Sequence, residues 1–324
     1  MQWLKCLVVG ALAMIAFGPA QAQDYPARTV TIVVPFTPGG ATDILARMLA
    51  QRLEQRLGRP FVIENKAGAG SVIGASYVAK AAPDGYTLLM APSGPMAVNV
   101  TMVKNLPYDP AADFIPLALV AGTPFMLVVN PSLPVNSVAD LIKYQKDRGG
   151  PLPFATVGPG IPHHLFAEML KNMTGIETSY VPYRGSTPAL SDVVAGHVPV
   201  MFCDVGPAGP MVAAGKVRAL GISSKTRVPA FQNVPPLHEA GVPGFDAASW
   251  QMLVAPSKTP RPIVDKLHAE LKAILAMPEI AEHISKNGMV PLEGRPVEGL
   301  HDFVKSEIAR WGKVVREAGI AGSQ

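Results

Sequence analysis

Glycines and polar side chains gather where predicted strands end and helices begin. The segment PFTPGGATD (35–43) follows an apolar run, and Gly39 and Gly40 would let its backbone approach a bound group closely. Thr42 and Asp43 stand at the expected helix start. One interpretation is an ordinary helix start, with Thr42 as the cap and Asp43 on the positive end of the helix dipole. The other is an anion site, because backbone N–H groups point outward at helix starts.

Similar turns follow later strands. They are APSGPMAVN (91–99), ATVGPGIPHHL (155–165), VPYRGSTPALSD (181–192) and MFCDVGPAG (201–209). Ligands of α/β proteins bind at the carboxyl ends of strands, so we expect these turns to share one site. Arg184 in the third turn either binds a carboxylate through two parallel hydrogen bonds or is a solvated surface residue.

Other chemistries fit the sequence poorly. The glycines of KAGAGSVIG (66–74) miss the dinucleotide-binding spacing by one residue, and no acidic residue follows in a suitable context. His164 and Glu168 are four residues apart, but they lack the HExxH order and a nearby cysteine, which argues against zinc. No Gly-x-Ser-x-Gly motif of a hydrolase is present. We therefore predict a binding protein without metal or cofactor, and not an enzyme.

The elements that must position these turns alternate between strand and helix. Short apolar or β-branched runs begin at residues 29, 61, 86, 152, 178, 198 and 217. Helical periodicity follows in segments that include 137–148, 162–174 and 187–195. Strands separated by helices predict parallel sheets that are covered on both faces, which is an α/β fold.

Two further apolar runs predict crossings between two domains. They are PFMLVVNP (124–131) and SWQMLVAP (249–256). The predicted domain I comprises residues 24–124 and 248–324, and domain II comprises residues 125–247. Domain I is expected to end in helices only.

The first residues and the composition bear on location. Lys5, an apolar run from Cys6 to Phe17, and Ala20-Gln21-Ala22 predict a signal peptide (1–22) that is cleaved after Ala22, since the run is too short to span a membrane. Without Lys5 the formal charge falls from +4 to +3, and the basic residues are scattered, which argues against nucleic acid. Cys203 would then be the one remaining cysteine. No internal disulfide could form, so stability must come from packing.

Read together, these strings resemble the substrate-binding receptors of tripartite tricarboxylate transporters, the Bug-type family. The similarity runs through YPARTVTIVVPFTPGGATDILAR, VIENKAGAGSVIGASYVAKAAPDGYTLL, LPYDPAADF, LVVNPSLP, VPYRGSTPALSDVVAGHVPVMF and HEAGVPGF. The resemblance implies the type II periplasmic-binding fold, with two α/β domains, two crossing hinge strands and a ligand cleft. It also implies a small carboxylate ligand, such as a tricarboxylate, a dicarboxylate, an acidic amino acid or an aromatic acid.

The resemblance assigns ligand-binding roles by position. The implied residues are Phe36, Thr37, Gly39, Gly40, Asp43 and Ser93 in domain I, and Thr156, Gly158, Gly160, His164, Tyr183, Arg184 and Gly185 in domain II. The family commonly has an Asp-Asn pair after VMF, where this chain has Cys203 and Asp204. We expect position 203 to lie at a strand end that faces the cleft, so this departure should alter ligand specificity. Cys203 and Asp204 are both expected to be ligand-binding residues.

The expected function is capture of a small organic carboxylate and its delivery to transporter membrane subunits, by a monomer in the periplasm. The few charged residues at the strand ends favour one or two carboxylates over three, because a trianion needs more compensation than Arg184 and helix dipoles supply. Two alternatives remain open. One is a subunit that presents its ligand to a sensor kinase, and the other is an exported α/β hydrolase or isomerase.

Overall fold

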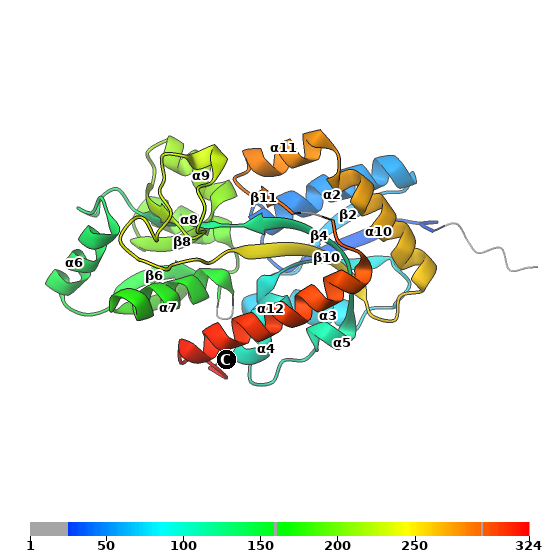
Figure 1. The fold of residues 1–324 in the computed structure, drawn as a ribbon, viewed down its shortest axis with the longest axis horizontal. Coiled ribbons are helices and arrows are strands. Elements are labelled where there is room, and N and C mark those ends of the chain that lie inside the picture. The colour runs from blue at the N-terminus through cyan, green and yellow to red at the C-terminus, as the bar shows by residue number, and fades with distance from the viewer. Residues whose placement is uncertain (1–24, 159–160, 293, 324) are drawn as a thin grey trace, which may run out of the picture.

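The chain forms two α/β domains, each built around its own sheet (Figure 1). The computed structural model describes residues 25–158, 161–292 and 294–323. The predicted signal peptide (1–22) and Gly160 lie outside these ranges. Within them, no helix combines the length and the apolar character that crossing a bilayer requires.

Domain I contains a six-stranded sheet with the order β11-β4-β10-β3-β1-β2. The strands are β1 (Val30–Val34), β2 (Phe61–Asn65), β3 (Thr87–Pro92), β4 (Phe114–Thr123), β10 (Ser249–Pro256) and β11 (Val290–Pro291). Strand β1 is parallel to β2 and β3, as expected, whereas β10 is antiparallel to both β3 and β4. The sheet is therefore mixed. Strand β11 also contradicts the expectation that the last part of the chain contains helices only.

Helices cover both faces of this sheet. They are α2 (Ala41–Leu57), α3 (Val72–Ala79), α4 (Asn99–Met102), α5 (Pro110–Asp113), α10 (Arg261–Leu275), α11 (Pro278–Lys286) and α12 (Val297–Glu317). Successive side chains of β1 point to opposite faces of the sheet, because side chains alternate along a strand. Ile32 and Val34 join the apolar cluster formed by α2, α10 and α11, and Val33 joins the cluster that includes α3 and α12.

Domain II contains a five-stranded sheet with the order β7-β6-β8-β5-β9. Its elements are β5 (Phe125–Val129), α6 (Val138–Arg148), β6 (Leu152–Thr156), α7 (Pro162–Thr174), β7 (Thr178–Pro182), α8 (Ser186–Ala195), β8 (Val200–Asp204), α9 (Val205–Ala213) and β9 (Arg218–Ile222). The three helices predicted from periodicity in this part of the chain are confirmed. Helices α6 and α7 pack on one face, and α8 and α9 pack on the other.

The chain passes between the sheets at two places. Strand β4 leads into β5 with only Pro124 between them, and the segment before β10 returns to domain I beside it, where Ser249 pairs with Thr123. Each of the two apolar runs predicted as crossings belongs to one sheet, and the ten-residue strand β4 was not predicted. The division at 124/125 and 247/248 stays a prediction.

The last helix also connects the domains. Helix α12 runs below β10 and β4 towards domain II in Figure 1. Its Trp311 stacks on Phe166 of α7, with ring centroids 6.2 Å apart. Glu307 of the same helix accepts hydrogen bonds from the indole N–H groups of Trp250 and Trp311, at 2.7 and 2.8 Å. This packing fixes α12 against the hinge side of both domains.

Candidate functional site

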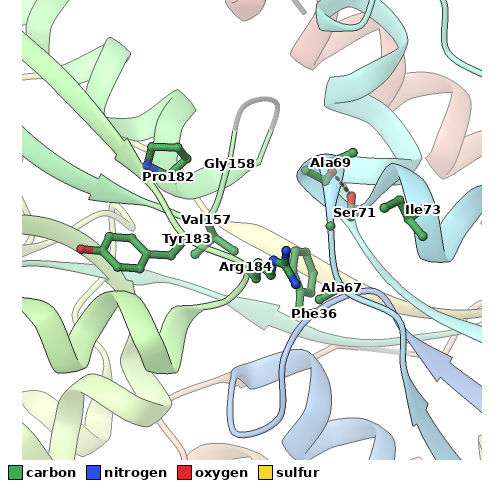
Figure 2. A pocket seen from close by; sticks show the side chains of 12 residues that line it. Phe36, Ala67, Ala69, Ser71, Ile73, Val157, Gly158, Pro182, Tyr183 and Arg184 are labelled. Carbon is green, nitrogen blue, oxygen red and sulfur yellow. Dashed lines mark hydrogen bonds between the residues drawn. The ribbon is translucent and has the colours of Figure 1, made fainter.

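A cavity of about 440 Å³ lies between the two domains, at the carboxyl ends of their strands (Figure 2). Domain I contributes the turn after β1 and the turn after β2. Domain II contributes the ends of β6 and β7. The lining residues are Phe36, Ala67, Gly68, Ala69, Gly70, Ser71, Ile73, Val157, Gly158, Pro182, Tyr183 and Arg184. Such a volume suits a small molecule.

Arg184 is the only cationic side chain among the described residues that line this cavity. It is exposed, and in Figure 2 it extends from domain II towards Phe36 of domain I. No ion pair or hydrogen bond engages its side chain within the described part of the chain. A guanidinium in this state can hold a carboxylate through two parallel hydrogen bonds.

The turn after β2 has an unusual backbone. Four consecutive residues have positive φ: Gly68 (136°), Ala69 (46°), Gly70 (57°) and Ser71 (75°). This region is costly for residues with a Cβ and needs support from neighbouring groups. Asn99, which is fully buried, gives that support by donating from Nδ2 to the Gly70 carbonyl at 3.1 Å. The turn is therefore held in a fixed shape against the cavity.

This turn is a part of the site that sequence reasoning missed. Its glycines miss the dinucleotide-binding spacing, and that pattern does not predict a ligand-binding turn here. A run of glycine, alanine and serine directly after a parallel strand was the available signal, because such composition permits close backbone approach. Val157 and Pro182 were missed for another reason, since apolar residues at strand ends resemble core residues.

The turn after β1 is organised by Asp43. Its carboxylate accepts hydrogen bonds from the Gly39 N–H at 3.0 Å, from Asn65 Nδ2 at 3.0 Å and from two nitrogens of Arg47 at 2.8 and 3.1 Å. Burial opposes ionisation, but these hydrogen bonds outweigh it and lower the pKa of Asp43. Asn65 also donates to the Phe36 carbonyl. Asp43 therefore orders the turn that carries Phe36. It lies outside the lining of the cavity.

The capping expectation for this helix was wrong. Helix α2 has Gly40 at its N-cap, without a side-chain cap, and the Thr42 hydroxyl donates to Gln251 Oε1 at 3.0 Å. Thr42 therefore bonds to a side chain of β10 and does not cap the helix.

Most of the predicted glycines lie where the two domains touch. A Cβ on Gly39 would meet Thr187 Oγ1 at 2.9 Å, and a Cβ on Gly158 would meet the Gly70 backbone at 3.4 Å. The Thr187 hydroxyl donates across the same contact to the Pro38 carbonyl at 3.0 Å. These glycines therefore allow the domains to approach one another closely.

A second contact lies beside these. A Cβ on Gly40 would lie 3.7 Å from Ser186 Oγ and 3.9 Å from Asp204 Oδ2. Gly185 and Thr37 meet in the same region, and the Thr37 hydroxyl oxygen is buried without a hydrogen-bond partner among the described residues.

His163, Ser186 and Asp204 form a buried polar network at this contact. Ser186 Oγ donates to Asp204 Oδ2, and His163 Nε2 lies 2.9 Å from Ser186 Oγ and 3.6 Å from Asp204 Oδ2. These directions make His163 Nε2 the donor to Ser186. A catalytic serine gives its proton to histidine, whereas here the serine hydrogen is directed to the carboxylate. The arrangement differs from a hydrolase triad and stabilises a buried anion.

His164 and Cys203 lie outside the described lining of the cavity. The His164 ring packs edge-on against Tyr180, with centroids 4.4 Å apart, and Nε2 lies 3.9 Å from Glu168. Burial lowers the pKa of His164. Cys203 is fully buried in the apolar cluster under α8 and α9, where burial raises the pKa of its thiol. The expectation that Cys203 faces the cleft was therefore wrong, because side chains alternate along β8. The neighbouring Asp204, which is also buried, is the residue that contacts Ser186.

The remaining predicted residues divide between lining and support. Phe36, Gly158, Tyr183 and Arg184 line the cavity. Ser93 is buried and its hydroxyl lies 2.8 Å from that of Ser249, while the Thr156 carbonyl accepts from the Tyr183 N–H at 2.7 Å. Ligand-binding roles for the predicted residues stay predictions. Among the described residues, no cluster of His, Cys, Asp or Glu side chains could hold a metal ion.

Comparisons with known proteins agree with this architecture. The chain is 38% identical over 302 residues to protein BugT of Bordetella pertussis, covering 93% of this chain and 92% of BugT. The structure of Rpa4515 of R. palustris with adipate superposes with a TM-score of 0.88 and 41% identity, over 92% of this chain and 99% of that one.

Two further solved structures are similar. The periplasmic binding protein BugD superposes with a TM-score of 0.87 and 35% identity, over 92% of this chain and 99% of BugD. MatC from Rhodopseudomonas palustris, with bound malate, superposes with a TM-score of 0.85 and 35% identity, over 90% of this chain and all of MatC. The family model described as the tripartite tricarboxylate transporter family receptor matches residues 45–320. The chain therefore belongs to this family of solute-binding receptors, which includes periplasmic binding proteins and has the type II periplasmic-binding fold.

Proposed function

We propose that this protein captures a small organic carboxylate in the cleft between its domains and delivers it to the membrane subunits of a tripartite transporter. Capture takes place in the periplasm, after removal of residues 1–22. The observation that carries the proposal is the cavity of about 440 Å³ between the domains, in which Arg184 is exposed and unpaired among the described residues. The adipate and malate held by two solved relatives support the ligand class.

The contacts across the cleft support a clamp mechanism. Phe36 and the turn at 67–71 belong to domain I, whereas Gly158 and Arg184 belong to domain II, so one ligand would touch both domains. A ligand that bridges the domains stabilises the closed arrangement, and closure gives the membrane subunits a shape to recognise.

Thermal unfolding tests the capture step. Mono-, di- and tricarboxylates, acidic amino acids and aromatic acids are screened for their effect on the Tm, with sugars and cationic amino acids as controls. A ligand at 100 times its Kd stabilises the native state by about 2.7 kcal/mol, which raises the Tm by several degrees. The proposal fails if every acid leaves the Tm unchanged, and a rise with a sugar or a cationic amino acid alone would indicate a different ligand class.

Two measurements test delivery and the absence of chemistry. Deletion of the gene should abolish uptake of the identified acid by cells that retain the membrane subunits, and the wild-type gene should restore it. Prolonged incubation of the purified protein with the acid should return the acid unchanged. Conversion of the acid would instead support the hydrolase or isomerase alternative.

A further inference from the structure

Most polar side chains of the cavity lining already make hydrogen bonds within the protein. The Ser71 hydroxyl donates to the Gly70 carbonyl, and Ser71 is 1% exposed. The Tyr183 hydroxyl donates to Asp192 at 2.6 Å, and in Figure 2 its ring points away from the cavity. Arg184 is thus the one side chain of the described lining that is free to bind a polar group of the ligand.

The side chains of the described lining offer no free acceptor to a ligand donor. Its described lining contains no acidic side chain. The Gly70 carbonyl already accepts two hydrogen bonds, one from Asn99 and one from Ser71, so both of its lone pairs are used. A hydroxyl or ammonium group of a ligand would therefore lose its water and find no replacement on these groups.

The side chains of the rest of the wall are apolar or absent. Phe36 and Ile73 offer hydrocarbon surface, Val157 is only 3% exposed, and the other residues of this part of the lining are glycine, alanine and proline. Burial of a polar group without a partner costs free energy, whereas burial of hydrocarbon on such a wall is favourable. One positive charge can compensate one carboxylate.

From this distribution we infer that the site selects carboxylates whose body is unsubstituted hydrocarbon. Arg184 binds one carboxylate, and the chain or ring behind it lies on Phe36 and Ile73. Hydroxy acids and amino acids of the same carbon skeleton bind more weakly, because no side chain of the described lining pairs with their extra group. This selectivity rests on the proposed function, since it concerns the ligand of the same cavity.

Matched ligands test the inference. Isothermal titration calorimetry on the mature protein compares two trios that differ by one group. The first trio is hexanoate, 2-hydroxyhexanoate and norleucine, and the second is glutarate, 2-hydroxyglutarate and glutamate. In each trio that binds, we expect the unsubstituted acid to bind at least about tenfold more tightly than the other two.

The outcomes are distinct for the two claims. Equal or tighter binding of the hydroxy or amino member overturns the selectivity but leaves the proposed capture of a carboxylate intact. If no acid of the trios or of the thermal screen binds, the proposed function fails and the selectivity fails with it.

A change in the wall should relax the selectivity. Ile73→Asn places a polar side chain at the exposed edge of the cavity, so we expect the preference for the unsubstituted acid to fall to about threefold or less. Val62→Asn is the matched control, because Val62 is exposed on β2 and outside the cavity lining. If Ile73→Asn does not fold, Ile73→Thr takes its place. An unchanged ratio in a folded variant overturns the assignment of selectivity to these walls.

Discussion

The hydroxyl oxygen of Thr37 in domain I occupies the space that a Cβ on Gly185 in domain II would take. The backbone of Gly185 is extended, with φ of −179°, so a side chain there would not strain domain II itself. Glycine is therefore required by the approach of the other domain. Gly40 differs, because a Cβ there would lie 3.7 Å from Ser186 Oγ, at an ordinary van der Waals distance.

Gly185→Ala should prevent full closure without unfolding either domain. The added methyl group collides with Thr37 only when the domains meet, so we expect ligand affinity to fall at least about tenfold, with cooperative melting retained. Small-angle scattering should show the wild type contracting on ligand addition, and the variant remaining at the larger radius.

A second substitution should reverse this effect. Thr37→Gly in the Gly185→Ala background removes the colliding side chain and leaves the Thr37 backbone nitrogen 3.2 Å from the new methyl position, so affinity should recover in part. Gly299→Ala on α12 is the control, because its nearest neighbour is 3.6 Å away. Contraction of Gly185→Ala to the wild-type radius would show that the contact between Gly185 and Thr37 does not limit closure.

Asp43→Asn should lower stability at neutral pH. The wild-type carboxylate is 4% exposed and accepts from Gly39, Asn65 and Arg47, so we expect a loss of about 1–3 kcal/mol in the free energy of unfolding. Affinity should also fall, because the turn that carries Phe36 loses its support. Asp147→Asn is the control, since the Asp147–Lys143 pair is exposed and should contribute less than about 1 kcal/mol.

The Asp43 effect should depend on pH in one direction. The folded protein lowers the pKa of Asp43 below the unfolded value near 3.8, so the stabilisation is fully present above that value. It disappears as the pH falls through the lower folded pKa. Chemical denaturation of the wild type and Asp43→Asn between pH 7 and pH 2 should show the two curves converging at the acid end. A constant difference over this range would contradict the assignment.

Arg184→Gln should weaken binding and leave folding unchanged. Loss of charge-assisted hydrogen bonds corresponds to about 1.5–3 kcal/mol, or roughly a 10- to 150-fold higher Kd. Arg184→Lys should be intermediate, because it keeps the charge but loses the two-nitrogen geometry. Arg59→Gln changes the same charge at an exposed position outside the cavity lining, so its Kd should match the wild type. Wild-type affinity in Arg184→Gln would remove Arg184 from the site.

Ser186→Ala should destabilise the protein by about 1–3 kcal/mol, because it removes the hydroxyl between His163 and the buried Asp204 carboxylate. Ser191→Ala on the same helix is the control, since Ser191 is exposed and should change stability by about 0.5 kcal/mol or less. Adding Asp204→Asn to Ser186→Ala should cost less than the sum of the single changes, because the unpaired charge is removed. Strict additivity in urea denaturation would show that the residues do not act as a network.

The sequence by itself determined the succession of elements and the edge on which the site lies. Apolar periodicity located α6, α7 and α8, because burial of one helix face imposes a local repeat. The turns after β1, β6 and β7 were identified as site segments because glycines and polar residues follow each strand. Arg184 and Phe36 could be placed in the site on this basis and on the family resemblance.

Only the tertiary structure decided how those segments meet. Strand β4 is stabilised by β10, which lies more than a hundred residues later, and Pro116 within β4 obscures its strand pattern. Two adjacent histidines also have different contacts. His163 lies within hydrogen-bond distance of Ser186, whereas His164 packs on Tyr180. Those contacts depend on which way each side chain points and on what the other domain brings against it. A local pattern of residue types carries neither piece of information, since both arise when distant segments pack together.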